Sequence, residues 1–328
     1  MSLDADAIVD RRRMRRKLTF WRVAAALIAI IGIVAVAARF GDQFSKLAGE
    51  STGYIARVKI NGLIRGDDER TESLEKLADS TSARAVIVHV NSPGGTTAGS
   101  EQLHDSLRRV AAKKPMVVVV DGLAASGGYI TAIAADQIFA QRTAIVGSIG
   151  VLIQYPNVTE LLKTIGVKVE EIKSSPLKAA PNGYEPTSPE ARAAMEALIM
   201  DSYGWFKGLV QSRRHMDNAQ LARVSDGRVF SGQQALDLKL IDALGDEKTA
   251  VAWLEKEKGV PASLKVRDWK LKPRFGDLSF LHLTAIALLK AVGLESFAQR
   301  LEAASTIQAL ERLNLDGLLA LWHPPATN

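Results

Sequence analysis

The sequence predicts an α/β protein in which helical layers cover a parallel or mixed sheet. Two short runs rich in β-branched residues, Arg84–Val90 and Met116–Val120, are typical of strands buried on both faces. Between these runs, Leu103, Leu107 and Val110 recur at helical spacing. Strand and helix patterns that alternate along the chain are typical of a sheet whose strands are joined by helices.

Further elements are predicted on either side of this pair of strands. In "YIARVKI", residues 54–60, apolar residues alternate with Arg57 and Lys59, which predicts a half-buried strand. Apolar residues return at helical spacing over 130–134, and "QIFA", residues 137–140, predicts the next strand.

The second half of the chain continues the alternation. "NVTELLKTIG", residues 157–166, predicts a helix closed by its glycine, and "VKVEEI", residues 167–172, predicts a strand. A long helix is expected over 189–214. Ser231 and Gln234 form a capping box that opens another helix. Neither glycine-rich stretch recurs, so no internal repeat is predicted.

Charge is concentrated at the N-terminus. Residues 1–40 carry eight Arg or Lys and three Asp, which supplies +5 of the net charge of +6. The remaining 288 residues are therefore almost neutral, which argues against a nucleic-acid-binding surface. The chain has no cysteine, which is compatible with an oxidising compartment.

An apolar run follows the basic cluster and predicts a transmembrane anchor at residues 18–40. From Leu18 to Ala38 the run has 21 residues, or roughly 30 Å as a helix, which matches a bilayer core. By the positive-inside rule, residues 1–17 form a cytoplasmic tail, and the chain after the linker 41–53 is exported.

Two other interpretations of the apolar run remain open. Ala35-Val36-Ala37 fits the small-residue pattern of a signal-peptide cleavage site, so the segment also fits a cleaved signal peptide. A buried core helix is the third interpretation, because apolar residues alone do not distinguish a bilayer from a protein interior.

Two glycine-rich turns follow predicted buried strands. In "NSPGG", residues 91–95, the chain leaves a strand, and such a turn presents unpaired N–H groups that can hold an anion. In "DGLAASGGYI", residues 121–130, Ser126 lies where a strand gives way to a helix, whose dipole stabilises a developing alkoxide. Taken alone, the first also fits an ordinary tight turn, and Ser126 also fits a helix N-cap.

The order of these stretches resembles the signal peptide peptidase A family of membrane-bound serine peptidases. "NSPGG" is followed about 30 residues later by "ASGGY" and then by "GSIGV" at 147–151, and "DGRVFSGQQALDLKLIDALG" at 226–245 is also similar to that family. The similarity extends from about residue 54 to residue 254. It implies a ClpP/crotonase-like α/β fold of repeated β-β-α type units and, because no repeat is found, the short single-unit form of the family.

The resemblance also implies a serine–lysine dyad. Ser126 matches the nucleophile, and Lys178 of "SSPLKAAP" matches the general base, with Lys173 as the nearby rival. Ser148 of "GSIGV" matches the auxiliary serine that hydrogen-bonds the lysine, although it also fits an ordinary turn serine.

The residues around Ser126 suit this chemistry. A serine needs an adjacent base, and a lysine serves only when neutral, so its pKa of ~10.4 must fall by several units. Burial without a carboxylate partner lowers it in this way. Ser126 is surrounded in sequence by alanine and glycine, and no histidine lies between His104 and His215. The backbone N–H groups of Gly95 and Gly127 are expected to hold the oxyanion.

The resemblance implies an endopeptidase that cleaves hydrophobic peptides, namely remnant signal peptides after export, without a cofactor or metal. It places the enzyme in the bacterial inner membrane, with the peptidase domain 54–270 on the periplasmic side and a helical C-terminal extension at 271–328. It further implies a homo-oligomer, an octameric ring with sites shared between subunits. A catalytically inactive crotonase-like scaffold and an acyl-CoA-type enzyme are the alternatives, although no acidic pair lies beside Gly94 or Ser126.

Overall fold

The computed structural model describes Trp21, residues 53–271 and residues 318–322. The chain divides into two compact units, residues 1–53 and 54–328. Every strand and helix discussed below belongs to the second unit.

Several predicted segments fall outside the described residues. These are the basic tail 1–17, the anchor 18–40 apart from Trp21, the linker 41–53 apart from Gly53, and most of the extension 271–328. Within the part of the chain that the structure describes, no helix is both long and apolar enough to cross a bilayer.

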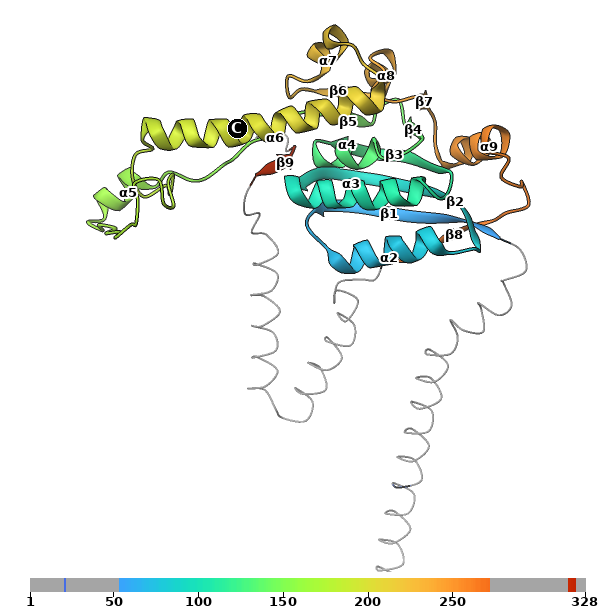
Figure 1. Cartoon of the computed structure of the whole chain (residues 1–328), viewed down its shortest axis with the longest axis horizontal. Coiled ribbons are helices and arrows are strands. Elements are labelled where there is room, and N and C mark those ends of the chain that lie inside the picture. The colour runs from blue at the N-terminus through green and yellow to red at the C-terminus, as the bar shows by residue number, and fades with distance from the viewer. Residues whose placement is uncertain (1–20, 22–52, 272–317, 323–328) are drawn as a thin grey trace, which may run out of the picture. The chain divides into compact units, whose positions relative to one another are not determined.

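The fold is built on one mixed sheet (Figure 1). The main strand order is β6-β5-β3-β2-β1-β8, with β4 and β7 beside β3, and β9 beside β2. The pairings between these named strands are parallel except β5 with β6 and β2 with β9. The strands are β1 Tyr54–Ile64, β2 Ala83–Thr96, β3 Met116–Ala125, β4 Gln137–Ala140, β5 Ile145–Gly147, β6 Val229–Ser231, β7 Ala243–Leu244, β8 Val266–Asp268 and β9 Leu319–Leu321.

Helices cover both faces of the sheet, which confirms the predicted α/β class. On one face, α2 (Asp68–Asp79), α3 (Thr97–Ala111) and α4 (Gly127–Ala132) pack against alternate strand residues such as Val88 and Val118. On the other face, α9 (Glu247–Lys258) packs against Ile87, Val117 and Val119. Both faces of β2 and β3 are thus buried. This explains why successive residues of these strands are apolar.

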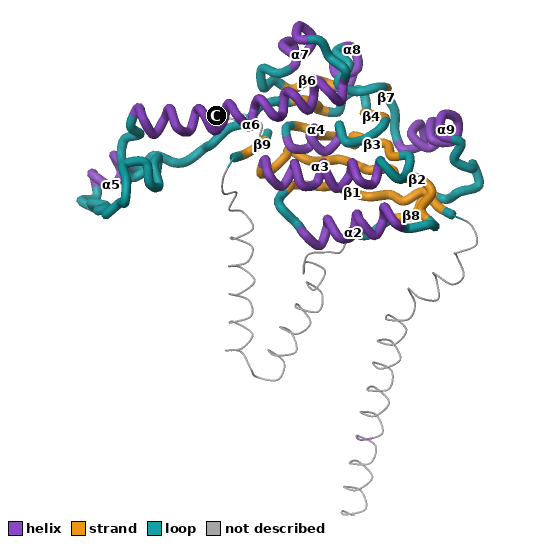
Figure 2. Tube along the Cα trace, viewed as in Figure 1, coloured by secondary structure: helices purple, strands orange, loops and turns teal. Residues whose placement is uncertain are grey.

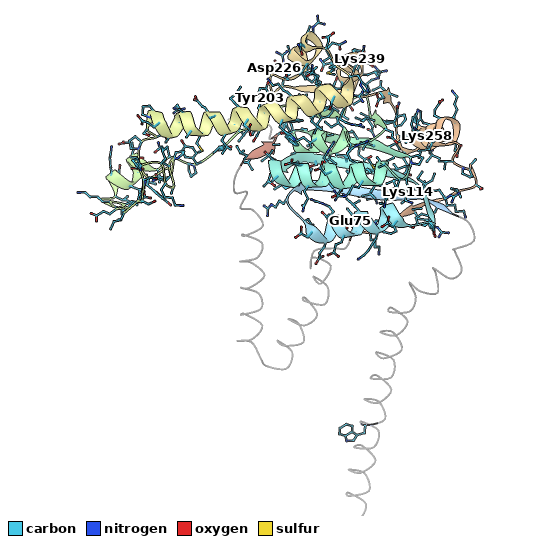
Figure 3. All side chains as sticks on the ribbon, in the orientation of Figure 1. Glu75, Lys114, Tyr203, Asp226, Lys239 and Lys258 are labelled. Atoms are coloured by element: carbon cyan, nitrogen blue, oxygen red, sulfur yellow. The ribbon has the colours of Figure 1, made fainter. Side chains whose placement is uncertain are left out.

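The elements alternate from β1 to α4 as β-α-β-α-β-α. This order differs from the repeated β-β-α units that the resemblance implied. Glu75 of α2 forms an ion pair of 3.6 Å with Arg109 of α3 at the surface of this layer (Figure 3). Because both side chains are about half exposed, the apolar contacts beneath them contribute more to the packing.

The long helix α6 spans Pro189–Arg214, as predicted. Ser188 caps its N-terminus, and near its C-terminus Arg213 donates to the carbonyls of Ile133 and Ala135 at 2.7 and 2.8 Å. Only Ala191, Phe206 and Val210 of this helix are buried. Its C-terminal half therefore docks on the layer that contains α4.

Two shorter helices lie beside α6. They are α7 (Asn218–Val224) and α8 (Gly232–Asp237), and Tyr203 of α6 donates to the carbonyl of Ser225, next to Asp226 (Figure 3). The predicted capping box is confirmed, because Ser231 Oγ accepts from Gln234 N and Gln234 Oε1 accepts from Ser231 N.

The prediction of a strand at 167–172 is wrong. The helix before it is present as α5 (Thr159–Thr164), but residues 165–188 join α5 to α6 as loop and turns (Figure 2). All six residues of 167–172 are exposed, and no neighbouring strand among the described residues supplies partners for their backbone groups. An alternating pattern alone does not form a strand without such a partner.

Candidate active site

Ser126 occupies a strained turn between β3 and α4. Its backbone has φ 54° and ψ −115°, a left-handed value that costs a non-glycine residue roughly 1–3 kcal/mol. The turn is held by Ser126 N, which donates to Gly147 O at 2.8 Å, and by Ser126 O, which accepts from Tyr129 N and Ile130 N. The side chain is almost fully buried.

The hydroxyl of Ser126 does not cap the helix. The residue stands at the N-cap position of α4, but its side chain makes no capping hydrogen bond. The interpretation of Ser126 as an ordinary N-cap is therefore wrong. A buried serine at a strained strand-to-helix junction is the arrangement that aims a nucleophilic oxygen into a site.

The helix that starts after Ser126 packs tightly on the layer beneath it. A Cβ added to Gly127 would lie 2.2 Å from Ser100 Oγ, and one added to Gly128 would lie 2.5 Å from Ser92 O. Tyr129 is fully buried and donates to Leu240 O at 2.8 Å, and burial raises its pKa well above the ordinary value. These contacts fix the position of the Gly127 N–H.

The "NSPGG" turn lies directly against α4. Gly94 has φ 102°, and a Cβ added there would lie 2.7 Å from Gly127 N. Ser92 Oγ accepts from Gly94 N at 3.1 Å and donates to Gly62 O at 2.7 Å. Because Ser92 takes the N–H of Gly94, the N–H of Gly95 is the next donor along the turn. The sequence pattern alone does not predict this role of Ser92.

Ser148 lies beside Ser126. The parallel pairing of β3 with β5 matches Ala125 with Gly147, so Ser126 and Ser148 both follow a paired residue at the ends of adjacent strands. Ser148 has φ 52°, is buried, and donates its N–H to Arg228 O at 2.8 Å. The structure thus brings together Ser126, Ser148 and the contact between Gly94 and Gly127.

Lys178 lies elsewhere in the chain. It belongs to the segment that joins α5 to α6, where it is exposed and its N–H bonds Ser175 O at 3.1 Å. Figure 1 shows α5 and the start of α6 beyond the edge of the sheet and well away from α4. Within one chain, the structure does not bring Lys178 to Ser126.

The rival base, Lys173, is held by carboxylates. Its Nζ lies 2.9 Å from Glu185 Oε1 and also contacts Glu171. Hydrogen bonds to Glu171 and Glu185 raise the pKa of Lys173 above its ordinary value. A cavity of about 490 Å³ beside Lys173 is lined by neither Ser126 nor Lys178. Lys173 is therefore poorly suited to act as a neutral base.

The described histidines have other partners or surroundings. His89 lies between Asp121 and Glu247, with nitrogen–oxygen distances of 2.9 and 2.8 Å. His104 is buried on α3, and burial lowers its pKa. His215 ends α6 in a left-handed conformation.

Comparison with known proteins identifies the family. Residues 108–261 match the model of peptidase family S49. A candidate protease of Synechocystis sp. is 35% identical over 200 residues, which cover 61% of this chain and 72% of the relative. The chain belongs to peptidase family S49.

Other S49 relatives carry more specific names. A candidate signal peptide peptidase of Enterococcus faecium is 30% identical, covering 64% of this chain and 65% of its own length. The chloroplastic serine protease SPPA of Arabidopsis thaliana is 29% identical, covering 65% of this chain but only 32% of the relative. These names support a serine-type protease related to signal peptide peptidase A.

The solved chains to which this chain is similar include a ClpP1 variant. A point mutant of ClpP1 from Listeria monocytogenes has a TM-score of 0.39 and 17% sequence identity, covering 58% of this chain and 91% of the ClpP1 chain.

Proposed function

We propose that this S49 peptidase is a membrane-anchored serine endopeptidase in which Ser126 is the nucleophile. The observation that carries the proposal is the Ser126 turn, because its buried hydroxyl is not used for capping and Gly94 of the neighbouring glycine turn lies against Gly127 N. A helix N-terminus and two backbone donors suit the negative charge that develops when a serine attacks a carbonyl.

The reaction is an acyl transfer. Ser126 Oγ forms a bond to the carbonyl carbon of the substrate while the base, Lys178, takes the hydroxyl proton of Ser126. The carbonyl oxygen becomes an oxyanion, which accepts hydrogen bonds from Gly95 N and Gly127 N. The peptide C–N bond then breaks, and the base protonates the leaving amine. Water, deprotonated by the same base, hydrolyses the ester and regenerates Ser126. In this proposal Ser148 accepts a hydrogen bond from the amine of Lys178, and this bond orients the lysine.

Lys178 is supplied by a neighbouring chain, in a homo-oligomeric ring with eight subunits. Two observations support sharing of the site. First, Lys178 is exposed on a segment remote from Ser126 in its own chain. Second, of the twelve large apolar side chains exposed among the described residues, ten lie between residues 155 and 200. We name residues 155–200 the exposed arm. An apolar surface of this kind is typical of an interface.

The substrates are hydrophobic peptides, namely signal-peptide remnants left in the membrane after export. The anchor at 18–40 would hold the peptidase domain 54–270 on the periplasmic side of the bacterial inner membrane, where such peptides are released. The proposed ClpP/crotonase-like assembly needs no cofactor, because serine, lysine and backbone donors supply each step.

The alternative functions are an inactive scaffold and an acyl-CoA-type enzyme. A scaffold would have no reason to retain a strained, buried serine, since strain of this kind costs stability. A covalent fluorophosphonate probe separates the classes. Labelling at Ser126 supports the peptidase, and an unlabelled Ser126 in folded protein supports a scaffold.

The direct test is peptidase activity of the detergent-solubilised full chain with and without Ser126→Ala. The variant should lose at least about 10³-fold in kcat/KM on a hydrophobic fluorogenic peptide. Ser212→Ala is a matched control, because Ser212 is exposed on α6 and bonds only the carbonyl of Leu209. Equal activity of the Ser126→Ala variant and the wild type would refute the assignment.

A further inference from the structure

Another cavity lies at the end of the sheet opposite to Ser126. It has a volume of about 430 Å³ and is lined by the start of β2, the residues just before β3 and the residues just after α9. Ser126 follows the other end of β3, which has ten residues, so the two ends are roughly 30 Å apart. This cavity is therefore separate from the candidate active site.

The cavity is lined by four basic side chains, and none of the described residues that line it is acidic. The four are Arg84, Lys113, Lys114 and Lys258. Figure 3 shows Lys114 and Lys258 on the same side of the molecule. Residues 41–328 carry a net charge of only +1, because residues 1–40 supply +5 of the total of +6. Four cations around one cavity are thus a local excess of positive charge, which attracts anions.

Carboxylates offset little of this charge. Lys113 pairs with Asp79, whereas the other three basic side chains form no ion pair among the described residues. Lys114 is partly buried and donates to the carbonyl of Ser80 at 2.5 Å. Burial, together with the nearby charges of Arg84 and Lys113, lowers the pKa of Lys114. An anion in the cavity would offset the repulsion among these side chains.

The chain enters the peptidase domain beside this cavity. Tyr54, the first residue of β1, pairs with Ala83, which lines the cavity. The N–H of Tyr54 donates to Ser82 O at 2.9 Å. The predicted linker 41–53 has 13 residues and spans at most about 45 Å when fully extended. The predicted anchor at 18–40 therefore tethers this end of the domain to the bilayer.

We propose that the cavity binds the phosphate headgroup of an anionic phospholipid. The proposal rests on the membrane anchoring in the proposed function. Lysine and arginine donors suit phosphate oxygens, and basic residues close to an anchor bind anionic lipids. Pro115, Val260 and Pro261 add apolar lining, which suits the glycerol carbons of a lipid. Headgroup binding would hold this end of the sheet at the membrane surface and leave the Ser126 end open to peptides released from the bilayer.

The experiment is native mass spectrometry of the full chain in neutral detergent micelles doped with phosphatidylglycerol or with phosphatidylcholine. Wild-type chains should retain phosphatidylglycerol at least about tenfold more often than phosphatidylcholine. The double variant Arg84→Gln with Lys258→Gln should reduce the retention of phosphatidylglycerol at least about tenfold, because it removes two of the four cations. Both side chains are exposed, so the change spares the core.

The matched control is the double variant Lys239→Gln with Lys248→Gln. It removes the same charge from two exposed lysines that do not line the cavity, so it should retain phosphatidylglycerol like the wild type. Arg84→Lys with Lys258→Arg conserves the charge and should keep most of the retention. All variants keep the basic tail 1–17, so its attraction to anionic lipids cancels in the comparison.

Three outcomes would overturn the headgroup site. The first is equal retention of the two lipids by the wild type, and the second is unchanged retention by the variant with Arg84→Gln. The third is an equal loss in the control variant, which would assign the binding to overall charge. Inorganic phosphate that displaces phosphatidylglycerol at an equal concentration would assign the cavity to a free anion and overturn the lipid as its occupant.

Peptide hydrolysis by the same samples tests the proposed function separately. An inactive wild type that retains phosphatidylglycerol contradicts the peptidase and supports the headgroup site. An active wild type that retains no phosphatidylglycerol contradicts the headgroup site and supports the peptidase. Recovery of the full chain from cells in the soluble fraction contradicts the anchor and, with it, the lipid as the occupant.

Discussion

The turn around Ser126 and the exposed arm around Lys178 differ in how many contacts their own chain supplies. Ser126 is buried, and its backbone N–H and carbonyl both form hydrogen bonds. Ile172 and Leu177 of the exposed arm are at least 47% exposed, and no described strand pairs with the segment between α5 and α6. The Ser126 turn forms its contacts within the chain, whereas the exposed arm presents apolar side chains that no described residue buries.

Under the proposed function, the difference separates the half of the site that one chain completes from the half that a second chain would complete. Backbone strain at Ser126 persists only because surrounding contacts determine it, so this half of the site requires no partner for its shape. Lys178 is exposed, and its backbone N–H bonds Ser175 O within the same loop, so a second surface could cover the arm without disturbing the sheet. The predictions below test this division, from the largest expected effect to the smallest.

The strongest test is complementation between two inactive variants. Ser126→Ala and Lys178→Ala should each lose at least about 10³-fold in activity, because each lacks one member of the dyad. When equal amounts are co-assembled, about a quarter of the sites should pair an intact serine with an intact lysine, by random mixing around a closed ring. Peptide hydrolysis by the mixture measures the recovery. Mixed oligomers that form and stay inactive would place the dyad within one chain.

The two lysines of the arm should respond differently to arginine. Lys178→Arg should be inactive, because a guanidinium stays protonated and cannot accept the serine proton. Lys173→Arg should keep most of its activity, because arginine preserves the pairing with Glu171 and Glu185. The reverse ranking of the two variants would make Lys173 the base.

Alanine at Gly94 should lower activity, whereas alanine at Gly204 should raise stability. Gly94→Ala should lower kcat by about 10²-fold or more, because its Cβ would lie 1.9 Å from Ala320 O and φ is 102°. Gly204→Ala should raise stability by about 0.5–1 kcal/mol, because that helical glycine has open space around it. Steady-state kinetics measures kcat of the first variant, and urea unfolding measures the stability of the second. A fully active Gly94→Ala would show that the turn does not position the oxyanion donors.

The smallest effects concern charged pairs. Glu247 contacts Arg57 and His89, and the hydrogen bond from Arg57 lowers the pKa of Glu247. Glu247→Gln should cost about 1 kcal/mol at neutral pH. A lowered pKa means that the stabilisation is present above the ordinary glutamate value and is lost as pH falls through the folded value. The penalty of the variant should therefore shrink in acid.

The matched control for Glu247→Gln is Glu160→Gln in the exposed arm. Glu160 pairs with Lys163 at 2.7 Å, but both side chains are at least 66% exposed. The change should cost less than about 0.5 kcal/mol. Urea unfolding at neutral and acid pH measures both variants. Equal losses of unfolding free energy in the two variants would show that partial burial does not strengthen the pairing of Glu247 with Arg57.

Local patterns were sufficient to predict much of the sheet and its helices. The β-branched run of β3 is buried on both faces, so its composition alone is diagnostic. The caps of α6 and α8 also follow from short-range side-chain bonds. The pattern at 167–172 failed because a strand depends on a neighbour that the pattern does not contain. β9 is only three residues long and pairs with a turn more than 200 residues earlier, so no local signal identified it.

The candidate site was predictable to the extent that it is made of turns. Ser126, Ser148 and Gly95 each lie in a short glycine-rich motif whose spacing constrains the backbone, and the structure brings them together. The sequence did not predict the role of Ser92, because a serine before proline and glycine occurs in many kinds of turn. Its role in holding this turn is seen only from its hydrogen bonds with Gly62 and Gly94. The position of Lys178 relative to Ser126 cannot be predicted from spacing if the two residues meet across chains.

The separation of Lys178 from Ser126 has a consequence for when the enzyme is active. If each dyad is completed only by assembly, an isolated chain is inactive until it meets others. Activity per chain would then depend on the local concentration of the protein, by mass action. Sparse chains would leave neighbouring proteins untouched, and proteolysis would begin only where enough copies have accumulated to close a ring.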